Sequence, residues 1–511
     1  MDTIELSIFS SRIESVCDEM GAILQRAAFS PNIKDRLDFS CAVFDAKGQL
    51  CAQAAHIPVH LGSMAYAMKE IVDQVDWQQG DMLAFNDPYL GGTHLPDVTL
   101  VCPVYFEDAL IGFVANRAHH ADIGSDTPGS MPLATHLDEE GLVISPVKVM
   151  RNNEASVEFE EIKQALRYTV ESTGDFNAQI SSNQRGAERL LSIVVEMGAE
   201  NYESALWHLN DYGDRLMLQL LSSIPDGLYD FEDVMDGDGL GAEYLKIKLK
   251  LTLNNNQVLA DFSGTAKQVG GNINCPLSVV AAAVYYVFRC LMPINTPACF
   301  GVYRRIAIKA EAGSLINATK PAAVAAGNVE TSTRLVDVVM GALAKAMPEK
   351  IPAASHGSMN NLAMGARDGG ASWNYYETIG GGMGAGAGYD GLSAIQTHMT
   401  NTLNTPIESL EMHYPLRIKR YQIRCHSGGL GKTKGGDGIV REMEFLQPAS
   451  VTLLTERRQR PPWGLAGGDS GQCGENWLNK EPLGAKVSVD VTPGDCLTIK
   501  TPGGGGYGIK T

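Results

Sequence analysis

The chain has 511 residues, 44% of them hydrophobic and 20% charged, a composition typical of a soluble globular protein with more than one domain. Acidic residues outnumber basic ones by 59 to 41, and the formal charge of −18 makes nucleic acid and membranes poor partners. Because no signal peptide or membrane-spanning run is visible and the ten cysteines contain no CxxC pair, we expect a cytoplasmic protein with reduced cysteines.

Hydrophobic periodicity predicts a multi-domain α+β fold with mixed antiparallel sheets, in three regions that span 1–225, 226–350 and 351–511. In the first, metal-binding region we expect a helix from Ile4 to Leu24, followed by two strands that begin at Phe39 and Leu50 and are joined by a turn at 45–48. A helix over 61–75 comes next, and then strands over 82–85, 98–106 and 110–115. The region should end in helices through 159–223. In the α/β middle region we expect a hairpin of 244–253 and 257–262 and helices over 277–291 and 332–347. The last region is glycine-rich and should form short strands.

Histidines gather in one part of the first region. Five of the eleven lie between residues 56 and 120, namely His56, His60, His94, His119 and His120. Two short motifs add carboxylates, because Asp97 follows His94 by three residues and Asp122 follows His120 by two. Imidazole and carboxylate together suit a divalent ion such as Zn, Mn or Fe.

The strands at 98–106 and 110–115 strengthen this interpretation. If they pair about Asp108, Asp97 lies opposite His119, and opposed residues of an antiparallel pair have Cα atoms about 5 Å apart. His94 lies in the adjoining glycine-rich loop. We therefore expect one divalent metal ion at this end of the hairpin, although the histidines could instead only hydrogen-bond the loop. Asp38 is the candidate fourth ligand, or else a turn cap.

Two glycine-rich segments resemble phosphate loops but lack their context. Gly431-Lys432-Thr433 has His426 where the motif needs glycine, and no helix follows. Gly386, Gly388 and Gly391 fit GxGxxG but lie inside a longer glycine run, with no acidic residue in place after a βα unit. Any ATP chemistry therefore belongs to another chain.

Residues 327–332 are expected to open the helix at 332–347, with Thr331 or Ser332 as the N-cap. Their glycine and polar side chains could line a pocket at the start of that helix. Alternatively, the segment is only a capping turn.

Long motifs throughout the chain resemble the hydantoinase B/5-oxoprolinase family, which includes the N-methylhydantoinase B-type subunit and the large metal-binding subunit of acetone carboxylase. The resemblance is carried by Asp38–Cys41, Ala55–Met64, Asn86–Tyr89, Gly91–Asp97, Arg117–Asp122, Ala178–Ile180, Gly327–Ser332 and Thr501–Gly508. Only the B-type half of the fused 5-oxoprolinases is recognisable, so we do not expect a fused enzyme.

The resemblance implies an ATP-dependent hydrolase of cyclic amides, acting on a hydantoin, 5-oxoproline or another lactam. A hydantoinase A-type ATPase partner would use ATP to phosphorylate the carbonyl oxygen. This chain would bind the metal through Asp38, His94, Asp97 and His119, and His120 or Asp122 would act as general base or orient a ligand. The metal would lower the pKa of a bound water so that it attacks the activated carbon.

Two alternatives remain open on the sequence alone. The chain could belong to an ATP-dependent carboxylase of the acetone carboxylase type, or it could be a scaffold with a structural histidine loop. We also expect an assembly with two copies of each chain, because an activated lactam hydrolyses in bulk water. The glycine-rich segments 380–391 and 503–508 would either line a passage between sites or form flexible surface loops. The sequence does not identify the lactam, the metal or the stoichiometry.

Overall fold

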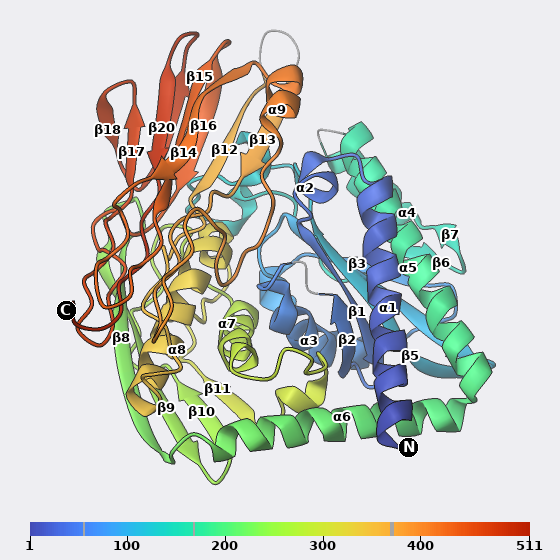
Figure 1. The fold of residues 1–511 in the computed structure, drawn as a ribbon. Helices are drawn as coiled ribbons and strands as arrows, with labels where there is room; N and C mark the ends of the chain where they lie inside the picture. Colours follow the sequence, from blue (N-terminus) through green and yellow to red (C-terminus); the bar gives the residue numbers. More distant parts are fainter. Residues whose placement is uncertain (55–56, 167–168, 368–371, 511) are drawn as a thin grey trace.

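The computed structural model describes residues 1–54, 57–166, 169–367 and 372–510 (Figure 1). The elements of the first region are α1 (Thr3–Ala27), α2 (Pro31–Lys34), β1 (Phe39–Asp45), β2 (Leu50–Ala54), α3 (His60–Ile71), β3 (Met82–Phe85), β4 (Asp97–Phe106), β5 (Ala109–His119), β6 (Val147–Arg151), β7 (Glu154–Ala155), α4 (Val157–Ala165), α5 (Thr169–Met197) and α6 (Ala199–Ser222). The predicted helices and strands of this region are confirmed, and short 3-10 turns connect several of them.

The later elements complete an α+β fold of several sheets, as predicted. They are β8 (Gly227–Gly237), β9 (Glu243–Asn254), β10 (Gln257–Asp261), α7 (Leu277–Cys290), β11 (Ile306–Lys309), η6 (Gly327–Thr331), α8 (Ser332–Ala346), β12 (Asn361–Ala366), β13 (Trp373–Glu377), α9 (Ile407–His413), β14 (Leu416–Arg424), β15 (Gly438–Phe445), β16 (Ala449–Leu454), β17 (Glu475–Leu478), β18 (Glu481–Leu483), β19 (Lys486–Val491) and β20 (Cys496–Lys500). The boundaries between regions near residues 225 and 350 stay a prediction.

A seven-stranded antiparallel sheet organises the first region, in the order β2-β1-β5-β4-β3-β6-β7. Helices α1 and α5 pack on it, α1 over β1 and β2 and α5 over β4 and β5. Helix α3 also touches β1, packs against α7 and thereby joins the sheet to the middle region (Figure 1). The sheet is therefore buried between helices, which explains why β1, β2 and β3 are hydrophobic with almost no polar alternation.

The middle region is a second sheet with α8 against it. The predicted hairpin of β9 and β10 is confirmed, and β11 adds to β10 in parallel. The sequence analysis missed β8, an acidic strand that pairs along β9. The helix predicted at 332–347 is also confirmed, and Thr331 stands at its N-cap position as predicted, but no side chain caps the helix. The Thr331 hydroxyl instead donates to Ile273 O, and the Ser332 hydroxyl donates to Asn328 O of the π-helical turn η6.

The C-terminal region is a β-sandwich. One sheet has the order β13-β12-β16-β19 and the other β14-β15-β20-β17-β18. Side chains of both sheets meet in one hydrophobic core, with Leu362 and Val451 from the first sheet and Met443 and Leu497 from the second. This core is separate from the large core that the first and middle regions share.

Below the sandwich, glycine-rich extended segments run side by side (Figure 1). Gly504 N donates to Gly436 O at 2.9 Å, and Gly436 N donates to Met383 O at 2.8 Å. A Cβ added to Gly382 would lie 1.9 Å from Gly436 O, and one added to Gly436 would lie 1.9 Å from Leu392 O. These segments pack backbone against backbone, and only glycine allows that approach. Residues 503–506 are buried, so this stretch is not a flexible surface loop, whereas residues 387–390 of the segment 380–391 are exposed.

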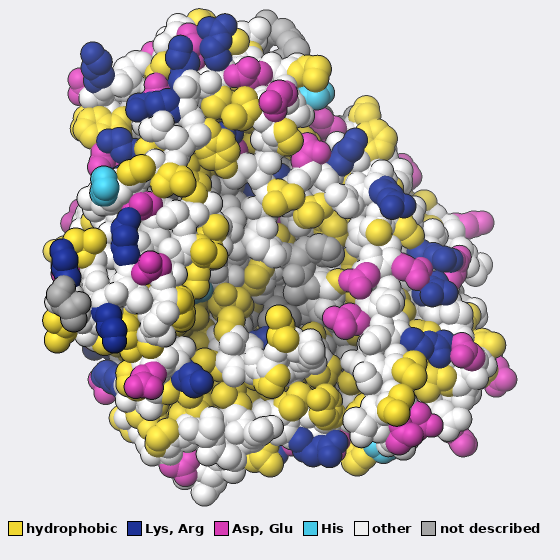
Figure 2. Space-filling model, in the orientation of Figure 1, with side chains coloured by type: hydrophobic (Ala, Val, Ile, Leu, Met, Phe, Trp, Pro, Cys, Tyr) yellow, Lys and Arg dark blue, Asp and Glu magenta, His cyan; other side chains and the backbone are white. Residues whose placement is uncertain are grey.

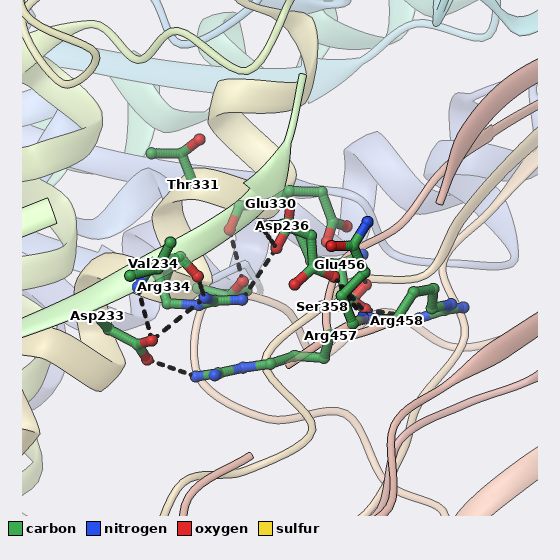
Figure 3. A network of polar contacts seen from close by, with 12 residues as sticks. Asp233, Val234, Asp236, Glu330, Thr331, Arg334, Ser358, Glu456, Arg457 and Arg458 are labelled. Carbon is green, nitrogen blue, oxygen red and sulfur yellow. Dashed lines mark hydrogen bonds and ion pairs between the residues drawn. The ribbon is translucent and has the colours of Figure 1, made fainter. Parts of the chain in front are cut away.

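A buried charge network ties the C-terminal region to the middle region (Figure 3). Glu456 accepts from Arg334 of α8 at 3.0 Å and from Lys486 of β19 at 2.6 Å. Arg457 pairs with Asp233 of β8 at 2.8 Å and also bonds Asp337 of α8. Both regions therefore depend on each other for the compensation of buried charge.

The face in Figure 2 is hollowed near its middle, and hydrophobic side chains gather there. A cavity of about 1630 Å³ is lined by α1, α6 and the segment that follows α7.

All ten cysteines are free, as predicted. No helix in the described part of the chain has the length and apolarity that a bilayer crossing requires.

Candidate metal centre

The candidate site lies where β4 begins and β5 ends. Asp97 pairs with His119, as the hairpin register predicted. A bulge is needed for this, because the register shifts by one residue between Val104 and Tyr105. Without the bulge, the two-residue turn at 107–108 would place His119 out of register with Asp97.

The loop before β4 is fixed by buried side chains. Asn86 donates to Leu95 O at 2.8 Å, and Arg117 donates to Gly91 O at 3.3 Å. Gly91 has φ +91°, and a Cβ there would lie 2.5 Å from Ala67 of α3. The loop must therefore contain glycine at this position, and it carries His94 back toward the end of the hairpin.

His94, Asp97 and His119 form a buried group that we call the triad. Asp97 Oδ1 lies 3.2 Å from His94 Nε2 and 3.3 Å from His119 Nδ1. One potential ligand atom from each of the three residues lies within 4.8 Å of the other two, and all three residues are buried. Ligand atoms around a tetrahedral ion with bonds of about 2.1 Å are separated by roughly 3.4 Å, so the spacing fits such an ion.

The electrostatics of the triad also suit a cation. Burial by itself raises the pKa of the Asp97 carboxyl, but His94 and His60 beside it lower that pKa well below its usual range. Burial lowers the pKa of His119, so its ring is neutral at pH 7. An ionised carboxylate and a neutral imidazole are the forms that bind metals. Moreover, the Nε2 atoms of His94 and His119 have no hydrogen-bond partner among the described residues.

Asp38 lies beside the triad without joining its close group. Its backbone oxygen accepts from His119 N at 3.0 Å, and its carboxylate lies 3.9 Å from the guanidinium of Arg36. Among the described residues, the group whose ligand atoms lie within 4.8 Å of one another contains only the three triad residues. The assignment of Asp38 as fourth ligand therefore stays a prediction.

His120 and Asp122 make their own contacts away from the triad. Successive strand residues point to opposite faces, so His120 points away from His119, toward the α5 side of the sheet. There its Nε2 lies 2.9 Å from Gln179 Oε1. Asp122 accepts from Gly124 N at 2.6 Å and from Arg367 at 3.2 Å. These contacts support a role in holding the end of β5, and proton transfer by either residue stays a prediction.

The π-helical turn η6 and the residues just before it reach the triad from the middle region. Asn328 Nδ2 donates to Asp97 Oδ2 at 3.4 Å, and Ala325 O lies 3.4 Å from His94 Nδ1. The buried Glu140 carboxylate accepts from the backbone N–H groups of residues 324 and 325, both at 2.8 Å. A Cβ on Gly327 would lie 1.8 Å from Asn274 O. Single π-helical turns are frequent at functional sites, and this one positions groups around two triad residues.

Sequence reasoning missed three contacts of the triad. His60 Nε2 lies 3.3 Å from Asp97 Oδ2, and Asn328 bonds the same oxygen. The ring of Tyr376, on β13, stacks on His119 with centroids 4.7 Å apart. His60 belongs to the histidine cluster, and Asn328 belongs to the segment 327–332 that the sequence offers as a pocket lining, but nothing in the sequence points to Tyr376. His56 lies outside the described residues.

The residues present therefore fit a divalent metal ion. His94 Nε2 and His119 Nδ1 lie beside an ionised carboxylate in a buried setting, and this donor set suits borderline divalent ions. His60, Thr93 and Asn328 all bond Asp97 Oδ2, which leaves Oδ1 to face the two triad histidines. Such outer contacts orient ligands in metal sites.

Residues 2–510 match the Hydantoinase B/oxoprolinase family. The chain is 38% identical to 5-oxoprolinase of Dictyostelium discoideum, over all of this chain and 40% of that protein. It is 31% identical to a protein of Pseudomonas sp. strain NS671 that is named as the B component of a D-/L-hydantoinase, over 99% of this chain and 90% of that one. Thus the chain spans nearly the whole of the hydantoinase component and less than half of the 5-oxoprolinase.

Two solved structures share the fold. The ATP-dependent caprolactamase of Pseudomonas jessenii superposes with a TM-score of 0.93 at 27% identity, over all of this chain and 91% of that one. Acetone carboxylase, in its nucleotide-free structure, superposes with a TM-score of 0.89 at 18% identity, over 99% of this chain and 76% of that one. The second likeness concerns the fold alone.

Proposed function

The chain belongs to the hydantoinase B/oxoprolinase family, and on that premise we propose that it is the metal-binding subunit of an ATP-dependent cyclic-amide hydrolase. Its substrate would be a lactam, such as a hydantoin or 5-oxoproline, whose carbonyl oxygen is phosphorylated by a hydantoinase A-type partner. The observation that carries the proposal is the buried triad of His94, Asp97 and His119, within a chain that matches a hydantoinase B-type component nearly end to end.

The chemistry explains why two sites are needed. Amide resonance spreads electrons into the carbonyl group and makes a lactam a poor electrophile. Phosphorylation of the carbonyl oxygen removes that resonance and supplies a leaving group. A divalent ion in the triad would supply Lewis acidity and lower the pKa of a coordinated water.

The chain's own residues would prepare this step. Asp97 and His119 are held opposite each other by the hairpin register, and His94 is brought to them by the fixed loop. Asn328 and His60 hold Asp97 Oδ2, so the carboxylate keeps one orientation while charge develops nearby. Asp38, the residue just before β1, would complete the ligand set. His120 or Asp122 would hold the end of β5 in place or accept the proton of the attacking water.

The metal assignment is tested by elemental analysis of purified variants. We expect one divalent ion per chain in the wild type and loss of that ion in His94→Ala and Asp97→Ala. His136→Ala is the matched control, because His136 also lies near an aspartate, at 3.2 Å from Asp138, but on the surface. Unchanged metal content in both triad variants would refute the assignment, and a wild type without metal would favour a scaffold.

The reaction is tested with the partner present. The co-purified complex should hydrolyse ATP in proportion to ring opening of a lactam, without consuming bicarbonate. Stoichiometric bicarbonate consumption would instead identify a carboxylase, the alternative suggested by the family resemblance.

A further inference from the structure

Arg36 is a fully buried cation without a close counterion. It lies between α2 and β1. The one ion pair that it makes among the described residues is with Asp38, at 3.9 Å, whereas close pairs of this kind are about 2.7–2.9 Å apart. Its Nε also has no hydrogen-bond partner in that part of the chain. A buried charge that is loosely paired destabilises a fold, so its presence here needs another explanation.

The close contacts of Arg36 are with Tyr376 of β13. Its Nη1 donates to Tyr376 O at 2.7 Å, and its Cζ lies 4.7 Å from the centroid of the Tyr376 ring. Its Nη2 also donates to Thr378 Oγ1 at 3.4 Å. Because a guanidinium is attracted by the electron-rich face of an aromatic ring, Arg36 fixes both the backbone and the ring of Tyr376.

The ring of Tyr376 in turn stacks on His119 of the triad. The two ring centroids are 4.7 Å apart, and the planes are inclined by only 10°. Arg36 and His119 belong to the first region, and Tyr376 belongs to the C-terminal sandwich. Thus one ring of the sandwich is held by a cation of the first region and lies flat against a triad histidine.

This stack matters because His119 lacks the hydrogen bond that orients most metal-binding histidines. Its Nδ1 lies 3.3 Å from Asp97 Oδ1, and its Nε2 has no partner among the described residues. In His94, by contrast, Nε2 lies near the same carboxylate oxygen and Nδ1 lies 3.4 Å from Ala325 O. A ligand histidine almost always donates its second N–H to an acceptor, and that bond fixes the ring. For His119, the stack on Tyr376 is the contact that can take its place.

We propose that Arg36 is a positioning residue of the metal centre, which holds the Tyr376 ring against His119 and so sets the orientation of that imidazole. The inference rests on the proposed function, because it takes the triad as a metal site. It adds a residue that acts on the triad through Tyr376, and it makes the geometry of the metal site depend on how the C-terminal sandwich docks.

The test is Co²⁺ binding to the metal-free full chain, followed by visible absorption, which reports both the affinity and the ligand geometry. Arg36→Lys keeps a cation beside Asp38 but loses the planar group that stacks, and Tyr376→Leu removes the ring. Each should weaken Co²⁺ binding about tenfold or more and alter the spectrum. Tyr376→Phe keeps the ring and should bind Co²⁺ as the wild type does.

A double variant and a control separate positioning from general stability. Arg36→Lys combined with Tyr376→Leu should lose no more affinity than Tyr376→Leu alone, because both changes act through one ring. Arg457→Lys is the matched control, since Arg457 is also buried and ties the C-terminal region to another region, at 2.8 Å from Asp233. It should lower the melting temperature without changing the Co²⁺ affinity or spectrum. If Tyr376→Leu does not fold, Arg36→Lys beside Arg457→Lys decides alone.

The proposal is overturned if Arg36→Lys keeps wild-type affinity and spectrum, if the losses in the double variant add, or if Arg457→Lys alters the metal site equally. Failure of the proposed function gives a different result, namely a wild type that binds no Co²⁺. The imidazole NMR signals of His119 in the metal-free chain, assigned with His119→Gln, then decide the inference. Signals that shift in Arg36→Lys but not in Arg457→Lys support the positioning of the ring, and signals that stay unchanged in both overturn it.

Discussion

Replacing Gly504 by alanine should destabilise the glycine-rich packing below the sandwich. The φ of Gly504 is not in the left-handed region, so alanine is excluded by space and not by backbone conformation. Its Cβ would lie 2.1 Å from Met383 O, whereas such contacts below 3.0 Å are essentially never observed. The two segments would therefore have to separate by about 0.9 Å.

Moving Gly504 away from Met383 also displaces it from its hydrogen-bond partners in two other segments, and the cost follows from the loss of those bonds. Gly504 N donates to Gly436 O at 2.9 Å, and Gly429 N donates to Gly504 O at 2.8 Å. Losing both costs about 2 kcal/mol, and overpacking adds about 1–3 kcal/mol. The lower entropy of the unfolded alanine chain offsets about 0.4–1 kcal/mol. The free energy of unfolding should thus fall by about 2–4 kcal/mol.

The assay is thermal and urea unfolding of the variant beside wild type and Gly270→Ala. A Cβ on Gly270 meets no atom within 4 Å, so this control should be neutral. For Gly504→Ala we expect the melting temperature to fall by roughly 2–4 °C, because a chain of 511 residues that unfolds as one unit loses about 1 °C for each kcal/mol. A melting temperature within about 1 °C of wild type would show that the segments separate freely and would refute the packing argument.

Two further predictions concern buried carboxyl groups. Glu456→Gln removes the carboxylate that pairs with the buried Lys486 and one of the two that pair with the buried Arg334, which keeps Asp233. It should lower the free energy of unfolding by about 3–5 kcal/mol in urea titrations, because the Lys486 cation is left buried without a partner. Glu232→Gln, in an exposed pair with Lys246, should change little, and equal effects of the two substitutions would contradict the role of the network. Burial raises the pKa of Glu140 to about 8, so the folded chain keeps a proton that the unfolded chain loses above about pH 4.5. The stability that this group contributes is present below pH 4.5 and is lost as the pH rises to about 8. The melting temperature of Glu140→Gln should therefore rise relative to that of the wild type across this pH range. A difference in melting temperature that does not change with pH would disprove the pKa shift.

Several features could be predicted from the sequence because they depend on neighbours in the chain. Helix α1 follows from its apolar periodicity. The pairing of Asp97 with His119 follows from two adjacent strands and a short turn, which fix the register locally. His94 is three residues away, so the sequence also placed it near the triad. The prediction that another chain supplies any ATP chemistry came from loop motifs and is untested by the fold.

Other features depended on contacts between distant segments. Strand β8 was missed because an acidic segment becomes a strand only through pairing with β9 and the charges it meets on α8 and near Arg457. The many glycines were visible in the sequence, but their purpose was not, because close backbone packing depends on which segments lie side by side.

The sequence by itself determined that His94, Asp97 and His119 lie together at one end of the hairpin. Only the tertiary structure decided what surrounds them. Asn328 and Tyr376 are more than 200 residues from Asp97. Asn328 reaches the triad because α3, α7 and α8 join the first sheet to the middle region, and Tyr376 reaches it because β13 packs against residues 128–130. Periodicity and turn chemistry report on residues within a few positions of each other, whereas the orientation of ligands and the choice of substrate depend on side chains that folding brings together from separate sheets.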